Sequence, residues 1–195
     1  MAGIFEETGR FVAFKTVLKK NLGNDRNALM YGAGQGGFEA FFILVFSMVS
    51  NIVMAVMLNA GMIDRLTAGI TDENALKTLY ATFAALSQTA PAIFLMSIVE
   101  RIAAVVLQIS LSVLVWFAAK NKKNFWFFPL ALLLHAFIDA FAVILAKNIS
   151  NIWIVLGFIY VLSACYAVIA ATVWKKNASF KENCATEETG TADEA

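Results

Sequence analysis

The sequence is short of the residue types that soluble domains and metal sites use most. Only 15% of its 195 residues are charged and 60% are hydrophobic, whereas soluble domains have about 25% charged and about 45–50% apolar residues. There is one histidine and no HExxH motif, so zinc is a minor alternative and we expect no cofactor. The two cysteines, Cys165 and Cys184, lack metal-type spacing and are not expected to pair. An ordinary soluble domain is therefore excluded, and structural disulfides are not expected.

An excess of charge of either sign is also missing. The formal net charge is +1, which gives no reason to expect a nucleic-acid partner. The N-terminus opens with Glu6 and Glu7 where a secretory signal has a basic region before an apolar core, so no cleaved signal is predicted. Information about function must therefore come from where the few polar residues fall.

Long apolar segments are what the sequence does contain. They predict an all-α fold, a polytopic integral membrane helix bundle over residues 1–174. The expected helices are 1–20, 28–60, a short one at 79–90, 92–119, 125–146 and 152–174. The last of these has no charge and is interpreted as lipid-facing support. The tail 175–195 has too few apolar residues to fold and is predicted to be disordered.

The first and fourth of these segments carry charges. Segment 1–20 contains Glu6, Glu7 and Arg10, so we expect it to cross the membrane where neighbouring helices shield them, the alternative being an interfacial helix. Segment 92–119 contains Glu100 and Arg101. A charge at the centre of a membrane helix costs about 2.5–3.5 kcal/mol on insertion scales. These side chains are therefore predicted to face the bundle interior, a partner or a wet cavity.

Basic residues predict the orientation in the cell membrane. One side of the membrane is assigned Lys15, Lys19, Lys20, Arg26, Lys120, Lys122, Lys123, Lys175, Lys176 and Lys181, and the other side Arg65, Lys77 and Lys147. By the positive-inside rule, the turn at Lys120 and the C-terminus are cytoplasmic. The predicted protein is thus a multi-pass membrane protein with a cytoplasmic tail.

Polar groups from four expected helices fall at one depth. Counted from the cytoplasmic ends, Glu6, Glu39, Gln108, His135 and Asp139 lie about 15–21 Å into the membrane at about 1.5 Å per residue. The pairs Glu6 and Arg10, Gln35 and Glu39, and His135 and Asp139 are each four residues apart and share a helix face. Such a layer suits hydrolysis, in which a carboxylate activates water. The alternative is a set of buried ion pairs that holds the bundle together, for example Glu100 or Glu39 with Arg101.

A glycine-rich string lies at the start of the second helix. It includes Gly32, Gly34, Gly36 and Gly37. No strand precedes it, so nucleotide binding is not favoured. Close helix packing through Gly32 and Gly36, four residues apart, is the preferred interpretation.

Four motifs together resemble the YhfC family of bacterial intramembrane proteases, within the type II CAAX prenyl protease and PrsW-like superfamily. They are EETGR at 6–10, YGAGQGGFEA at 31–40, ERIAAVVLQISLS at 100–112 and HAFID at 135–139. The resemblance implies that Glu6 and Glu7 polarise the attacking water and that Arg10 is their basic partner. It also implies that His135 stabilises the oxyanion and that Asp139 orients it. The expected function is a glutamate-dependent intramembrane peptidase that acts on a transmembrane peptide or protein.

The chain departs from the family pattern at two positions. Gln35 stands in the glycine motif and Gln108 after the ER motif, where the family pattern has histidine, and glutamine cannot act as a base. The double glutamate also comes close to Met1, whereas family members have further helices before it, so a truncated or divergent member is expected. Two alternatives remain open: an inactive relative that binds a membrane peptide or partner, and a small transporter or channel. No internal repeat supports the second.

Overall fold

The computed structural model describes residues 2–89, 91–149 and 151–178, and within these ranges the chain is helical without strands. The helices are α1 (Ala2–Lys15), α2 (Arg26–Asn59), α3 (Ile63–Thr67), α4 (Glu73–Gln88), α5 (Pro91–Lys120), α6 (Phe127–Asn148) and α7 (Ile152–Asn177), with short 3-10 turns η1 (Lys19–Asn21) and η2 (Lys122–Asn124). Within the same ranges, Arg26–Asn59, Ile93–Lys120, Lys122–Asn148 and Ile152–Asn177 are long and apolar enough to span a membrane. The prediction of an all-α membrane helix bundle is therefore confirmed.

Helix ends follow local sequence signals. Asp72 caps α4 by accepting from the backbone N–H of Asn74 at 2.9 Å, and Asn151 caps α7 by accepting from that of Trp153 at 3.0 Å. Pro91 is the first residue of α5, where its missing N–H is not needed. Gly61, with φ of 66°, follows the end of α2 in the left-handed conformation that glycine adopts easily.

Several helix bounds differ from those expected. α1 ends at Lys15 and not at residue 20, because the N–H of Leu18 bonds the carbonyl of Ala13 and closes the helix. With 14 residues it is about 21 Å long, shorter than the hydrocarbon core. The short helix expected at 79–90 begins earlier, at Glu73, where Asp72 caps it. α7 continues beyond residue 174 to Asn177, and the rest of the expected disordered tail, 179–195, lies outside the described residues.

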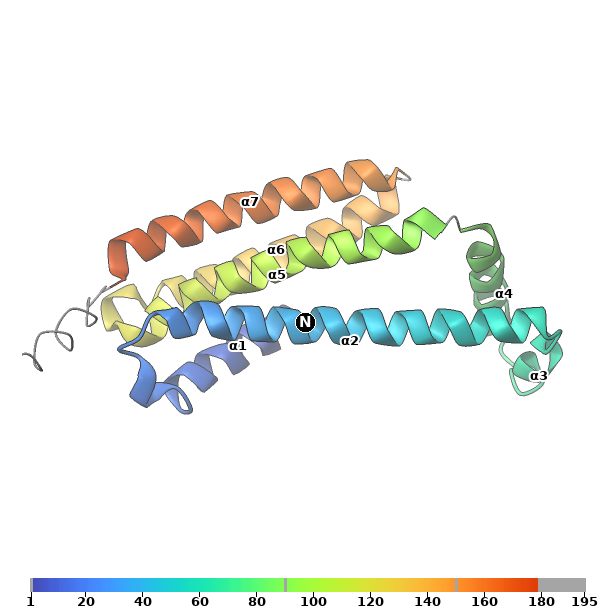
Figure 1. The fold of residues 1–195 in the computed structure, drawn as a ribbon, viewed down its shortest axis with the longest axis horizontal. Coiled ribbons are helices and arrows are strands. Elements are labelled where there is room, and N and C mark those ends of the chain that lie inside the picture. The colour runs from blue at the N-terminus through green and yellow to red at the C-terminus, as the bar shows by residue number, and fades with distance from the viewer. Residues whose placement is uncertain (1, 90, 150, 179–195) are drawn as a thin grey trace, which may run out of the picture.

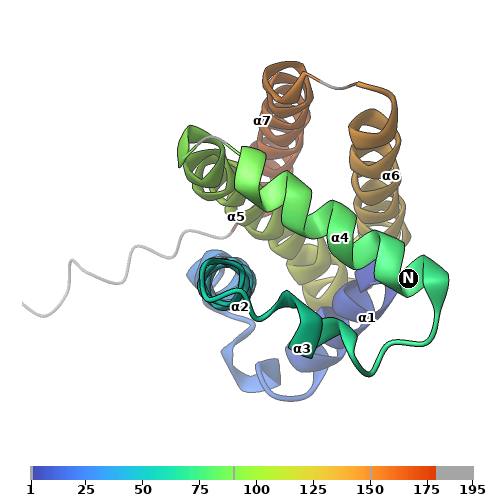
Figure 2. The same cartoon turned by 90° about the vertical axis from the view of Figure 1, so that its right-hand side faces the viewer.

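Helix α5 is the centre of the bundle. Figures 1 and 2 show α2, α6 and α7 arranged around it, with the short α1 beside its C-terminal half and α4 crossing the far end. We call the end that carries Lys120 the Lys120 end, and the opposite one, where α5 begins, the Pro91 end. Every neighbour of α5 can therefore present side chains to one central helix.

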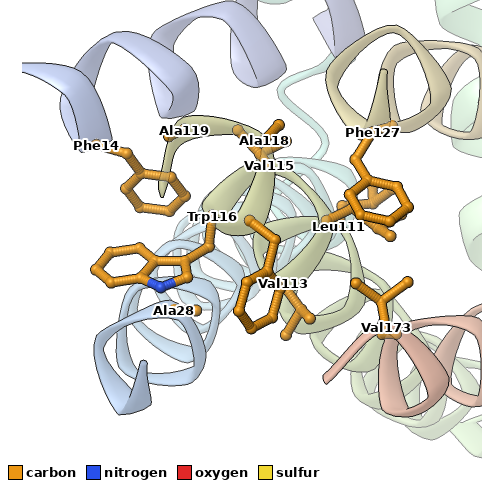
Figure 3. Close-up of a cluster of buried hydrophobic side chains, with 14 residues drawn as sticks. Phe14, Ala28, Leu111, Val113, Val115, Trp116, Ala118, Ala119, Phe127 and Val173 are labelled. Atoms are coloured by element: carbon orange, nitrogen blue, oxygen red, sulfur yellow. The ribbon is translucent and has the colours of Figure 1, made fainter. Parts of the chain in front are cut away.

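The hydrophobic core lies at the Lys120 end (Figure 3). Each residue of α5 from Ser110 to Ala119 is buried, so this part of α5 is covered on all sides. The cluster around it includes Phe14 of α1, Ala28 of α2, Phe127 and Ala131 of α6, and Ala170 and Val173 of α7. Asp25, just before α2, accepts hydrogen bonds from Trp116 Nε1 at 2.9 Å and Lys120 Nζ at 2.6 Å. This end thus combines apolar packing with a polar tie between the α1–α2 connection and α5.

Candidate active site

The face of α1 that turns into the bundle carries two adjacent glutamates in different environments. Glu7 and Arg10, three residues apart, are 0% and 1% exposed. Arg10 Nη1 donates to both carboxylate oxygens of Glu7 at 2.8 Å. The side chain of Glu6 is 30% exposed. Glu7 is therefore fully engaged in a buried ion pair, whereas the side chain of Glu6 remains partly exposed.

His135 of α6 is held by α1. Its Nδ1 lies 2.7 Å from Glu7 Oε1, and because a carboxylate can only accept, Nδ1 donates. A Cβ atom on Gly3 would lie 2.9 Å from Cγ of His135, so α1 approaches the ring closely because residue 3 has no side chain. The ring is thereby fixed with Nε2 directed away from Glu7.

The second nitrogen of His135 lies near two carboxylates. Nε2 is 3.9 Å from Glu6 Oε2 and 3.8 Å from Asp139 Oδ1. Both distances exceed that of a hydrogen bond. We expected Asp139 to orient His135, but the orienting hydrogen bond comes from Glu7, because α1 brings that carboxylate closer than the next turn of α6 does. The Asp139 side chain is 49% exposed.

Gln108 of α5 connects these groups. Its Oε1 accepts from Arg10 Nη2. Its Nε2 donates to Glu6 Oε2 at 2.9 Å and to Glu39 Oε2 at 2.8 Å. An amide has one acceptor oxygen and two N–H donors, whereas a neutral imidazole has one donor and one acceptor, so histidine could not make all three bonds. Gln108 therefore links Glu6, Arg10 and Glu39 in one hydrogen-bonded network. Asp139, the other carboxylate of the expected layer, lies beside this network at 3.8 Å from His135.

Glycines bring α2 close enough to join this network. A Cβ atom on Gly32 would lie 2.6 Å from Ile109 Cα, and one on Gly36 would lie 2.9 Å from Gln108 Cβ. The predicted close packing through these two glycines is confirmed. It places Gln35 Oε1 at 3.2 Å from Arg10 Nε, which donates to it, and it places Glu39 against Gln108.

A cavity of about 170 Å³ opens beside the network. Its polar lining includes Glu39, Glu100, Arg101, Gln108, His135 and Asp139. Arg101 Nη2 donates to Glu100 Oε1 at 2.6 Å, so Arg101 pairs with Glu100 and not with Glu39. The two residues are adjacent on α5 and partly exposed, so this pair does not join helices. Every site residue predicted from the sequence thus lies in the network or along this cavity.

Two contributions to the site, from Gly3 and from α7, were not predicted from the sequence. Gly3 has no pattern that marks it as the contact of the histidine. α7 was interpreted as lipid-facing support, but its Leu156, Ile159 and Tyr166 are buried. Tyr166 donates its hydroxyl to the carbonyl of Leu134 at 3.0 Å, next to His135. Since a buried tyrosine hydroxyl generally needs a partner, a tyrosine in an uncharged span is the signal that could have indicated this role.

Comparison with known proteins identifies the family of the chain. A sequence model of the YhfC intramembrane metalloprotease family matches residues 1–159. The chain belongs to this family. A curated relative from Bacillus subtilis (strain 168), described as the uncharacterized membrane protein YhfC, is 33% identical over 179 residues, which cover 90% of this chain and 67% of the relative. No solved structure matches the chain significantly. The protein is therefore a multi-pass membrane protein of the YhfC family, and the side that the Lys120 end faces stays a prediction.

The residues of the site do not fit the metal that the family's description implies. Most catalytic zinc sites use three protein ligands, and in the part of the chain that the structure describes no three His, Cys, Asp or Glu side chains come together as metal ligands. Both oxygens of Glu7 and Nδ1 of His135 are already engaged. Arg10, a permanent cation, lies in the same network and opposes the binding of a second cation. As arranged here, the donor set of the described residues therefore offers no three-ligand site for a resident zinc ion.

Proposed function

We propose that this protein is an intramembrane peptidase in which Glu6 activates a water molecule. The observation that carries the proposal is the state of the Glu6 carboxylate. Gln108 holds Oε2, and no described residue donates a hydrogen bond to Oε1. The same carboxylate lies 3.9 Å from Nε2 of His135. Membership of the YhfC family supports this reaction class.

The geometry supports a simple sequence of proton transfers. Glu6 Oε1 takes a proton from water as the water oxygen attacks the carbonyl carbon of the peptide. His135, in its doubly protonated form, donates from Nε2 to the oxygen that becomes an oxyanion. When the C–N bond breaks, the proton on Glu6 passes to the leaving nitrogen. Glu7, Arg10 and Gln108 position His135 and Glu6 and take no proton themselves.

The substitution Glu6→Gln tests the general base. Glutamine keeps an oxygen that can accept from Gln108, so the fold is retained, but it cannot take a proton. We expect cleavage of fluorogenic transmembrane peptides by the purified protein in liposomes to fall about 10²–10⁴-fold. Glu73→Gln, on the exposed first turn of α4, is the matched control and keeps full activity. Equal, nonzero cleavage by the parent and by Glu6→Gln would refute the mechanism.

The second candidate, an inactive relative that binds a membrane peptide, is favoured by Gln35 and Gln108. Both amide oxygens accept from Arg10, and neither side chain can serve as a base. The substitution Gln35→His separates the two candidates. A weakened peptidase gains activity on the same fluorogenic peptides, whereas an inactive relative cleaves none of them in either form.

A further inference from the structure

A second cavity lies between α5, α6 and α7 on the Pro91 side of the active site. Its volume is about 380 Å³. Its apolar walls include Ile93 and Met96 of α5, Ala146 of α6 with Ile149 directly after it, and Val155 and Leu156 of α7. We call it the wedge. Figure 2 looks onto this end, where α6 and α7 lie on the same side of the bundle and are joined to each other.

The wedge and the active-site cavity are adjacent. Glu100, Ala142 and Ile159 line both cavities. The active-site cavity also contacts His135, the proposed oxyanion donor. A chain segment that lies across His135 can therefore extend directly into the wedge.

We propose that the wedge is the substrate subsite that binds large apolar side chains on one side of the scissile bond, with the peptide unwound at that point. This inference rests on the proposed peptidase function and adds the substrate class. The preferred substrate is a membrane-spanning segment with a bulky apolar residue, such as leucine or phenylalanine, next to the cleaved bond.

The size of the wedge explains why the bound segment is unwound. A helix with its side chains is about 10–12 Å across. A volume of about 380 Å³ is at the lower end of the roughly 300–1,000 Å³ of ligand sites, so it accepts a few side chains and not a helix. A helix would also keep its carbonyl groups bonded within itself and away from His135.

The polar groups of the wedge favour a peptide over a lipid chain as the occupant. Ser97 and Glu100 lie on its α5 wall, and Glu100 uses Oε1 for Arg101. An unwound peptide has free backbone N–H groups that need acceptors in a membrane. A lipid acyl chain has no such donors. The hydroxyl of Ser97 and the second oxygen of Glu100 can accept from a peptide that enters beside them.

The first test measures binding without cleavage. In a Glu6→Gln background with Cys165 and Cys184 changed to serine, Ser97→Cys places one thiol in the wedge. A transmembrane peptide of about 20 apolar residues with one central cysteine should form a disulfide with it. The control is Ala167→Cys, on α7 outside the wedge. A crosslink at position 97 that exceeds the one at 167 supports the wedge even when no form cleaves peptides. If no crosslink forms at position 97, or if it only equals the crosslink at position 167, the proposed subsite is refuted. This is the result expected from a wedge filled by lipid.

The second test measures specificity. Ala142→Phe fills the junction of the two cavities. Ala146→Leu fills the exposed rim of the wedge, where a larger side chain is tolerated, so it serves as the second variant if Ala142→Phe fails to fold. Both should lower kcat/KM for fluorogenic peptides with phenylalanine beside the cleaved bond relative to those with alanine, by roughly 10-fold or more. Ala167→Phe, equally half-buried but away from the wedge, leaves the ratio unchanged. An unchanged ratio in folded Ala142→Phe and Ala146→Leu, with cleavage intact, refutes the subsite while the peptidase function stands.

Discussion

The Lys120 end and the Pro91 end of the bundle are packed in opposite ways. Of the most apolar stretch of α5, 72% is buried, and the continuous run from Ser110 to Ala119 lies at the Lys120 end. None of the most apolar stretch of α2 is buried, and around the Pro91 end α5, α6 and α7 enclose the wedge. The candidate active site lies between the two. Its polar network is flanked by a closely packed core on one side and by a cavity on the other.

The two arginine–glutamate pairs show the same difference. The side chains of Arg10 and Glu7 are 0% exposed, and those of Arg101 and Glu100 are 19% and 41% exposed. A fully buried pair is costly to break, because the remaining partner is left as an uncompensated charge. A partly exposed pair can be solvated when its partner is lost. The first pair therefore belongs to the framework of the site, whereas Glu100 of the second pair lines both cavities.

Breaking the buried pair should give the largest effect. We expect Arg10→Met to lower the free energy of unfolding by about 3–5 kcal/mol, because Glu7 would remain buried without its cation. Arg101→Met should cost about 0–1 kcal/mol. Unfolding in mixed micelles, followed by circular dichroism, measures both. Similar losses in the two variants would contradict the difference between the ends.

Forcing α2 away from α5 should have the next largest effect. Gly32→Ala places a methyl group against the backbone of Ile109, so we expect a loss of about 1–3 kcal/mol and weaker contacts of Gln35 and Glu39 with the network. Gly34→Ala is the control, since a Cβ there has no atom within 4 Å. It should be neutral or stabilising by up to about 1 kcal/mol. The same unfolding assay distinguishes them, and a harmless Gly32→Ala would disprove the close contact.

Removing the indole hydrogen bond at the Lys120 end should have a smaller effect. Trp116→Phe removes the Nε1 donor to Asp25 and should cost about 1–2 kcal/mol. Trp153 is 65% exposed at the start of α7, so Trp153→Phe should change stability by less than about 0.5 kcal/mol. Equal values for the two tryptophans would show that the Asp25 tie does not stabilise this end.

Metal removal should have the smallest effect. Because the site residues do not fit zinc, we expect the purified protein to hold no stoichiometric zinc by elemental analysis. Chelator treatment should leave both the melting temperature and peptide cleavage unchanged. Stoichiometric zinc that is lost in His135→Ala would contradict the assignment, whereas zinc retained in that variant would be bound elsewhere.

Much of the site could be predicted because residue spacing fixes depth and face in a membrane helix. The rise per residue put Glu6, Gln108 and His135 at one level, and four-residue spacing identified Gly32 and Gly36 as a packing face. Spacing could not assign partners between helices. The choice between Glu7 and Asp139 as the residue that orients His135 depends on how closely α1 approaches α6.

The sequence by itself determined the all-α membrane class, the four long apolar spans and the set of polar residues, because the cost of polar groups in lipid acts on each segment separately. The tertiary structure alone decided how the two adjacent glutamates differ. Glu7 is buried and bonded to Arg10 and His135, whereas Glu6 accepts from Gln108 and its side chain stays 30% exposed. The tertiary structure also decided the burial of α7 and the presence of the wedge. Both depend on how separate helices pack against α5, which cannot be derived from any one segment of the sequence.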